Sequence, residues 1–124
     1  MLSGMVSTIF KLVDEASWPA AVVAGRFEGS AVDLQDGYIH FSTAAQVRET
    51  AARHFARHPG LLLITVDAAA LGDALRWEPS RGGALFPHLY GPLSLDAVRA
   101  ITPLPLDDTG QHVFPNLDSP PYTL

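Results

Sequence analysis

The pattern of apolar and polar residues along the chain predicts six short β-strands. The stretch STIFKLV is rich in β-branched and aromatic residues, which favour strands. The run LLLITVD is apolar almost without a break, which indicates a strand buried on both faces. The predicted strands span residues 7–13, 38–42, 61–67, 74–78, 85–93 and 98–104. Pro103 cannot donate a backbone hydrogen bond, so the last strand fits the edge of a sheet.

Two segments carry helix signals. Ser17-Trp18-Pro19 opens a short helix that Gly25 ends, because proline fits the first turn of a helix and glycine its end. Thr43 and Gln46 have the spacing of a capping box, so a second helix begins there and continues to about Arg57. Between the two helices, the glycines and acids of residues 25–37 predict a loop.

The order of these elements predicts the fold class. Both helices come early and none separates the later strands, so a doubly wound parallel sheet does not fit. We expect an α+β domain with mainly antiparallel strands over residues 1–106. Residues 107–124 contain few helix formers and several prolines and aspartates, and we expect an extended C-terminal tail there.

Composition narrows the class of protein. A chain of 124 residues fits one domain that buries its own core. It has no cysteine, which excludes disulfides and thiolate chemistry, and no apolar run long enough to span a membrane. No signal peptide pattern is present. The net charge of −5, without a basic cluster, argues against nucleic-acid binding. These features favour a cytoplasmic protein.

The stretch DGYIHFST places a histidine inside an apolar strand. Alternation puts Tyr38, His40 and Ser42 on one face and the core residues Ile39 and Phe41 on the other. The polar face could line a cleft. The alternative is that His40 donates a hydrogen bond to a neighbouring carbonyl and only fixes the loop.

The stretch FPHLYGP repeats this arrangement. His88 and Tyr90 share one face of a strand with Phe86, and together they could hold a flat ligand by stacking and hydrogen bonds. The alternative is an ordinary amphipathic edge strand. Glu78 could enter the same cleft and serve as a base, if Trp77 points to the core; otherwise Glu78 is a solvated strand end.

Common catalytic and metal-binding motifs are absent. His54 and His58 lie four residues apart, but the arginines among them favour a solvated helix end over a metal site. The chain has no GxSxG elbow and no phosphate-binding glycine motif. We therefore expect no metal ligands.

The sequence resembles the bacterial domain-of-unknown-function family 952. The resemblance rests on five features in a fixed order, namely an IFKLV-type strand, Trp18, DGYIHFSTAAQV, LRWE and FPHLYGPL. The resemblance runs from about Thr8 to Leu104. It implies an ADP-ribosylation-like fold, in which two small antiparallel sheets flank a cleft that binds NAD in active enzymes.

The resemblance also implies roles for individual residues. His40 matches the position that holds the nicotinamide-side ribose or amide, and His88 or Tyr90 matches a later clamp on the nicotinamide. Ser42 and Thr43 would lie at the rim of the cleft.

The catalytic glutamate is where the sequence departs from active ADP-ribosyltransferases. Many of them use a late glutamate, whereas no glutamate follows Glu78 in this chain. Glu78 is therefore the candidate catalytic residue. The resemblance leaves two hypotheses, a transferase-like domain that binds NAD or an ADP-ribose-containing ligand, and a non-catalytic module that binds a nucleotide or another small molecule.

Overall fold

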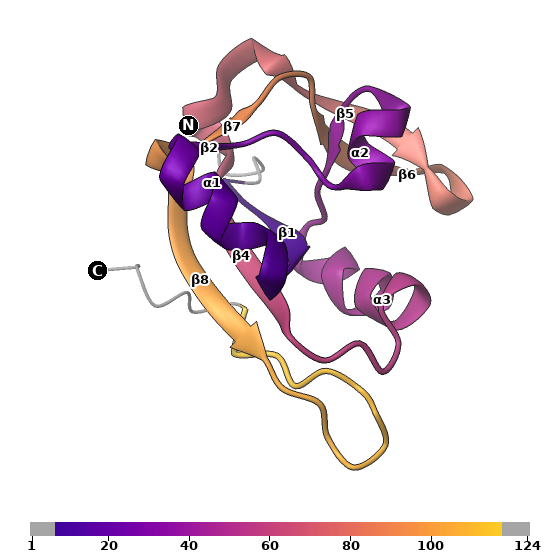
Figure 1. Cartoon of the computed structure of the whole chain (residues 1–124). Helices are drawn as coiled ribbons and strands as arrows, with labels where there is room; N and C mark the ends of the chain where they lie inside the picture. The colour runs from indigo at the N-terminus through magenta and orange to yellow at the C-terminus, as the bar shows by residue number, and fades with distance from the viewer. Residues whose placement is uncertain (1–6, 118–124) are drawn as a thin grey trace.

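Small antiparallel sheets dominate the computed structural model, which describes residues 7–117 (Figure 1). The strands are β1 (Thr8–Asp14), β2 (Arg26–Phe27), β3 (Ile39–His40), β4 (Leu61–Asp67), β5 (Leu75–Ser80), β6 (Ala84–Leu89), β7 (Leu93–Ser94) and β8 (Val98–Leu104). The α-helices are α1 (Trp18–Ala24), α2 (Ala31–Asp36) and α3 (Ala44–His54). Short 3₁₀ turns cover Glu15–Ser17, Ala68–Ala74, Arg81–Gly83 and Leu95–Ala97. The α+β class with small antiparallel sheets is confirmed.

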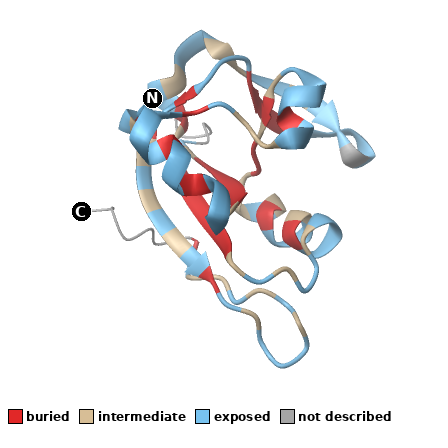
Figure 2. Cartoon of the chain, in the orientation of Figure 1, coloured by how far each residue is buried: buried red, intermediate tan, exposed pale blue. Residues whose placement is uncertain are grey.

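Strand β4 forms the centre of the core. It pairs with β1 on one side and β8 on the other, and six of its seven residues are buried. Ile64 packs into one apolar cluster with α1, and Leu63 packs into a second cluster with α3. Figure 2 shows β1 and β4 as the buried strands of the domain. The predicted burial of this strand on both faces is therefore confirmed, and so is the edge position of Pro103 on β8.

A second three-stranded sheet, in the order β3-β6-β5, carries the candidate site residues. His40 lies directly opposite His88 in the pairing of β3 with β6. Arg76 lies opposite His88 on the other side, and Glu78 lies opposite Phe86. Since side chains alternate along strands, all of these polar side chains share one face of the sheet.

The predicted strand 38–42 connects the two sheets, because its first residues pair with one sheet and its end pairs with the other. Ile39 and His40 pair with β6, whereas Ser42 forms a bridge with Phe10 of β1. The Ser42 amide donates to the Phe10 carbonyl at 2.9 Å, and the Phe10 amide donates back at 2.8 Å. This crossing brings the end of the histidine strand against β1.

The predicted loop over residues 25–37 is wrong, because it contains the helix α2. Ser30 and Asp33 form a capping box at its start, and Gly37 ends it with a positive φ of 88°. A six-residue helix is too short to show an apolar period. The expectation of only two substantial helices early in the chain therefore missed α2.

The other helices follow their sequence signals. Trp18 and Pro19 open α1 and Gly25 ends it in the left-handed region. Thr43 and Gln46 form the predicted capping box of α3, which ends at His54 because Phe55 leaves helical geometry. Within residues 7–117, no helix is long and apolar enough to cross a membrane.

Residues 105–117 run back against the domain. Leu106 and His112 form an isolated bridge, and the Asp107 carboxylate accepts hydrogen bonds from the amides of Thr109 and Gln111. Leu117 is buried in the cluster beneath α3. The rest of the predicted tail, residues 118–124, lies outside the described residues.

Truncating either face of β4 should destabilise the fold strongly. We expect Leu63→Ala and Ile64→Ala each to lower the free energy of unfolding by about 2–5 kcal/mol, because each leaves a cavity in a different cluster. Urea denaturation measures this. As a control, Ile101→Ala removes a side chain that is 47% exposed on β8 and should cost less than about 1 kcal/mol. Equal losses in all three variants would contradict the two-sided core.

Candidate functional site

A pocket of about 600 Å³ opens between the β1 sheet and the β3-β6-β5 sheet. Both histidines identified from the sequence, His40 and His88, belong to its wall. Residues of β1, the start of α2, the 40–42 segment, α3 and the β5-β6 hairpin surround it. They are Phe10, Lys11, Leu12, Asp14, Ser17, Ser30, Ala31, Val32, His40, Phe41, Ser42, Thr50, His54, Phe55, Ser80, Phe86 and His88. We call this space the histidine pocket.

The rings of His40 and His88 lie next to each other, and both contact the ring of Tyr38. The ring centroids of His40 and His88 lie 5.5 Å apart, with the rings nearly edge to face. Tyr38 stacks on His88 at 4.2 Å and tilts against His40 at 4.6 Å, but does not line the pocket. The rings of Tyr38 and His40 lie together and Ile39 is buried, as predicted, whereas Phe41 lines the pocket with His40 and Ser42 instead of sharing only the core face. Tyr38 thus contacts both imidazoles and restrains their positions.

Both ring nitrogens of His40 face carboxylates. Nδ1 lies 2.6 Å from Asp33 Oδ1, and Nε2 lies 3.0 Å from Asp36 Oδ2. The His40 backbone amide also donates to Asp33, at 3.1 Å. An imidazole ring donates or accepts hydrogen bonds through these two nitrogens, so the two carboxylates hold the orientation of the His40 ring. The expected alternative, donation to a backbone carbonyl, is not what the ring does.

Asp33 and Lys11 form a buried ion pair behind His40. The Lys11 ammonium lies 2.8 Å and 3.0 Å from the two Asp33 oxygens, and the two side chains are only 7% and 1% exposed. Burial alone would raise the pKa of Asp33, but the His40 hydrogen bond and the Lys11 charge outweigh it and lower the pKa to about 2. Burial lowers the pKa of Lys11, and Asp33 opposes that change.

The sequence analysis did not identify Lys11, Asp33 or Asp36 as partners of His40. One signal was present, since Lys11 is the only lysine in the chain and interrupts a buried strand pattern. A lysine at such a position requires a counter-charge. The sequence does not show which of the acidic residues supplies it, because Asp33 is 22 residues away.

Glu78 holds His88. Its Oε1 lies 2.7 Å from His88 Nδ1 and accepts a hydrogen bond from the Tyr90 hydroxyl at 2.8 Å. The hydrogen bonds from His88 and Tyr90 lower the pKa of Glu78. The hydrogen bond between Tyr90 and Glu78 in turn raises the pKa of Tyr90. The structure therefore brings Glu78, His88 and Tyr90 together, but Glu78 and Tyr90 do not line the pocket. Trp77 is 36% exposed, so it does not point into the core.

The two hydroxyl residues after His40 have different environments. Ser42 is buried in the pocket wall, and its Oγ lies 3.0 Å from Thr50 Oγ1. Thr43 does not line the pocket, because it caps α3: its amide donates to Gln46 Oε1 at 3.0 Å. The Thr43 amide and hydroxyl are therefore used in the capping box of α3.

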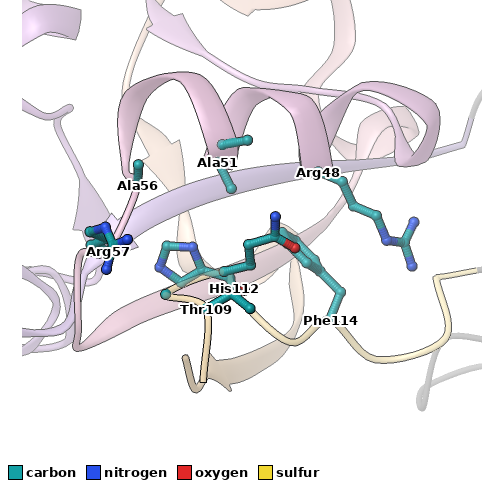
Figure 3. A pocket seen from close by; sticks show the side chains of 10 residues that line it. Arg48, Ala51, Ala56, Arg57, Thr109, His112 and Phe114 are labelled. Carbon is teal, nitrogen blue, oxygen red and sulfur yellow. The ribbon is translucent and has the colours of Figure 1, made fainter. Parts of the chain in front are cut away.

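A second hollow lies between α3 and the 109–114 segment. It measures about 380 Å³ and shares no lining residue with the histidine pocket. Figure 3 shows Arg57 and Arg48 at its two ends, with His112 between them. The guanidinium of Arg48 lies over the Phe114 ring, and His112 Nε2 is 2.8 Å from the His58 carbonyl oxygen. This second hollow has arginines at its rim, but its described lining residues include no carboxylate that could pair with a base.

The described residues 7–117 contain no group of three or more histidine, aspartate or glutamate side chains that could hold a metal ion. The side chains that line the histidine pocket carry imidazole, carboxylate, ammonium and hydroxyl groups.

Replacing Asp33 by asparagine should destabilise the protein by about 3–5 kcal/mol, because Lys11 would then be buried without a counter-charge. Urea denaturation at pH 7 measures the loss. Asp36→Asn is the matched control, since the Asp36 side chain is 39% exposed and should cost under about 1 kcal/mol. The double variant Lys11→Met/Asp33→Asn should recover part of the loss, and failure to recover would contradict the role of the ion pair.

The low pKa of Asp33 predicts a specific acid sensitivity. A carboxyl that titrates at about 2 in the folded chain and near 3.8 when unfolded stabilises the fold fully above about pH 4. That contribution, about 2 kcal/mol, is lost as the pH falls towards 2. Between pH 5 and pH 2 the wild type should therefore lose about 2 kcal/mol more than Asp33→Asn does. Parallel curves for the two proteins would contradict the assignment.

Comparison with known proteins gives a family but no activity. A family described as "Protein of unknown function (DUF952)" matches residues 12–101. The crystal structure of protein CC0527 from Caulobacter crescentus is 50% identical, with a TM-score of 0.83 over 86% of this chain and 94% of that chain. Its solution NMR structure, also 50% identical, gives a TM-score of 0.77 over 86% and 91% of the two chains. No curated protein matches the sequence. The chain belongs to the DUF952 family.

Proposed function

We propose that the chain binds NAD or an ADP-ribose-containing ligand in the histidine pocket. The observation that carries this proposal is the position of His40 and His88, which come from adjacent strands and line one pocket between two sheets. The resemblance to ADP-ribosyltransferases, in which a cleft between two small sheets binds NAD, supports the same ligand.

The size and the wall of the pocket fit such a ligand. A volume of about 600 Å³ lies within the range of roughly 300–1,000 Å³ that small-molecule sites occupy. Aromatic side chains in the wall could contact a planar nicotinamide ring, and hydroxyl side chains could bond to ribose. The aromatic residues are Phe10, Phe41, Phe55 and Phe86, and the hydroxyl residues are Ser17, Ser30, Ser42, Thr50 and Ser80.

His40 would contact the ligand through Nε2. Asp33 is almost fully buried and holds Nδ1, whereas the Asp36 side chain opposite Nε2 is 39% exposed. An exposed carboxylate can leave an ion pair at little cost, because such a pair contributes only about 0–1 kcal/mol. A ribose hydroxyl or a phosphate oxygen could then take the place of Asp36 and accept the Nε2 proton in a hydrogen bond.

One observation argues against transfer of ADP-ribose to a protein acceptor. Glu78, the candidate catalytic carboxylate, bonds to His88 and Tyr90 and is not part of the pocket wall. Asp14 is the acidic residue among the described lining residues, and it is paired with His58 at 2.8 Å. Neither carboxylate is placed to activate a protein acceptor directly.

NAD should raise the melting temperature of the wild type by about 8–16 °C at 100 times its dissociation constant, since this concentration adds about 2.7 kcal/mol of stability. Differential scanning fluorimetry and titration calorimetry with NAD, ADP-ribose and nicotinamide measure the effect. His40→Ala should abolish the shift, whereas the control His112→Gln, outside the histidine pocket, should keep it.

Two results would contradict the proposal. If none of the three compounds shifts or binds the wild type, the pocket does not take nicotinamide or ADP-ribose ligands. If the shift survives in both His40→Ala and His88→Ala, the ligand binds elsewhere.

A further inference from the structure

In the described part of the chain, one ring nitrogen of His88 has no side-chain partner. Its Nδ1 lies 2.7 Å from Glu78 Oε1, and no partner of Nε2 is recorded among the described residues. His88 lines the pocket and Glu78 does not, so the edge of the ring opposite Nδ1 faces the pocket. A neutral imidazole that donates from Nδ1 to a carboxylate carries its lone pair on Nε2, where it can accept a proton.

The surroundings of His88 fix this orientation. The Glu78 carboxylate accepts from both His88 and Tyr90, while Tyr38 stacks on the face of the imidazole at 4.2 Å. A carboxylate behind an imidazole sets the tautomer and stabilises the imidazolium that forms when the ring takes up a proton. His40 lacks this property, because both of its nitrogens already face carboxylates.

The burial of His88 limits what it can act on. Its side chain is only 5% exposed, so a base at this depth can reach a small acceptor inside the pocket but not a residue on another protein. Water is the acceptor that fits.

We propose that the pocket hydrolyses the bond between nicotinamide and ribose in NAD, with His88 as the catalytic base and Glu78 as its positioning residue. This inference rests on the proposed function, because it requires NAD in the histidine pocket. The oxygen of a water molecule forms a bond to the ribose carbon, and its proton passes to His88 Nε2. The carbon–nitrogen bond breaks, and its electron pair stays on the pyridinium ring, which leaves as neutral nicotinamide. His88 then releases the proton to solvent, and the other product is ADP-ribose.

The decisive measurement is the rate of nicotinamide release, followed by chromatography from pH 5 to pH 9 beside NAD affinity by calorimetry. His88→Gln should lower the rate about 100-fold or more, the size expected for loss of a general base. Glu78→Gln keeps an oxygen that can accept from Nδ1 but removes the charge. It should lower the rate about tenfold and move the acid limb of the profile to lower pH, since the imidazolium loses its counter-charge.

Tyr90→Phe provides a shift of opposite sign. It removes the hydroxyl that donates to Glu78, so the carboxylate stabilises the imidazolium more strongly and the acid limb should move to higher pH. Glu49→Gln, the same change at an exposed glutamate on α3, is the matched control and should alter neither the rate nor the profile.

Among the described residues, the charged and titratable groups that face His88 and could affect the pH profile are Arg76, Glu78, Tyr90, Tyr38 and His40.

Each failure has a separate meaning. No NAD binding to the wild type overturns the proposed function and this inference together. Tight NAD binding without nicotinamide release overturns only the hydrolysis. Undiminished release by a folded His88→Gln overturns the role of His88, and unshifted profiles in Glu78→Gln and Tyr90→Phe overturn the positioning role of Glu78. If His88→Gln fails to fold by circular dichroism, the two opposite shifts still decide the matter.

Discussion

The buried charge of Asp33 is the constraint around which the candidate site is organised. A carboxylate with 1% side-chain exposure cannot rely on water, so each of its hydrogen bonds must come from the protein. Its partners are the Lys11 ammonium from β1, the Ser30 amide that opens α2, and both the ring and the amide of His40 from β3. β1 therefore has to meet the neighbouring elements α2 and β3 at one side chain, although Lys11 lies 22 residues from Asp33 in the sequence.

This requirement makes two neighbouring histidines chemically different. His40 and His88 are a direct cross-strand pair, and a pair of this kind could share one environment. Instead His40 lies between two aspartates, whereas His88 bonds through one nitrogen to a glutamate. The register places the rings side by side, but both ring nitrogens of His40 face carboxylates, whereas Glu78 takes only one nitrogen of His88.

Much of the fold could be predicted from the sequence where the pattern is long. The seven-residue strands and α3 carry enough periodic positions to be recognised, and Thr43 marks the start of α3 through its capping box. The six-residue α2 was missed because two turns contain too few apolar positions to show a period. The crossing of residues 39–42 between two sheets also depends on partners that are far away in the sequence.

The sequence predicted which candidate site residues share a face of a strand, but it did not predict which of them form hydrogen bonds with one another. Alternation placed Tyr38 with His40, and His88 with Tyr90. It could not show that Glu78 would bond to His88, because this pair lies on a diagonal of the β5-β6 register. The distinction between a residue that lines the pocket and one that supports it from behind appears only in three dimensions.

The buried ammonium of Lys11 also gives the chain an internal chemical label. Lys11 is the only lysine, and it is 6% exposed. Lys11 lines the histidine pocket, but its nitrogen lies against both Asp33 oxygens in the folded state, so an amine-reactive reagent modifies it only when this ion pair opens. The modification rate of this one side chain therefore reports how often the ion pair between β1 and α2 breaks, at the position where the histidine pocket is assembled.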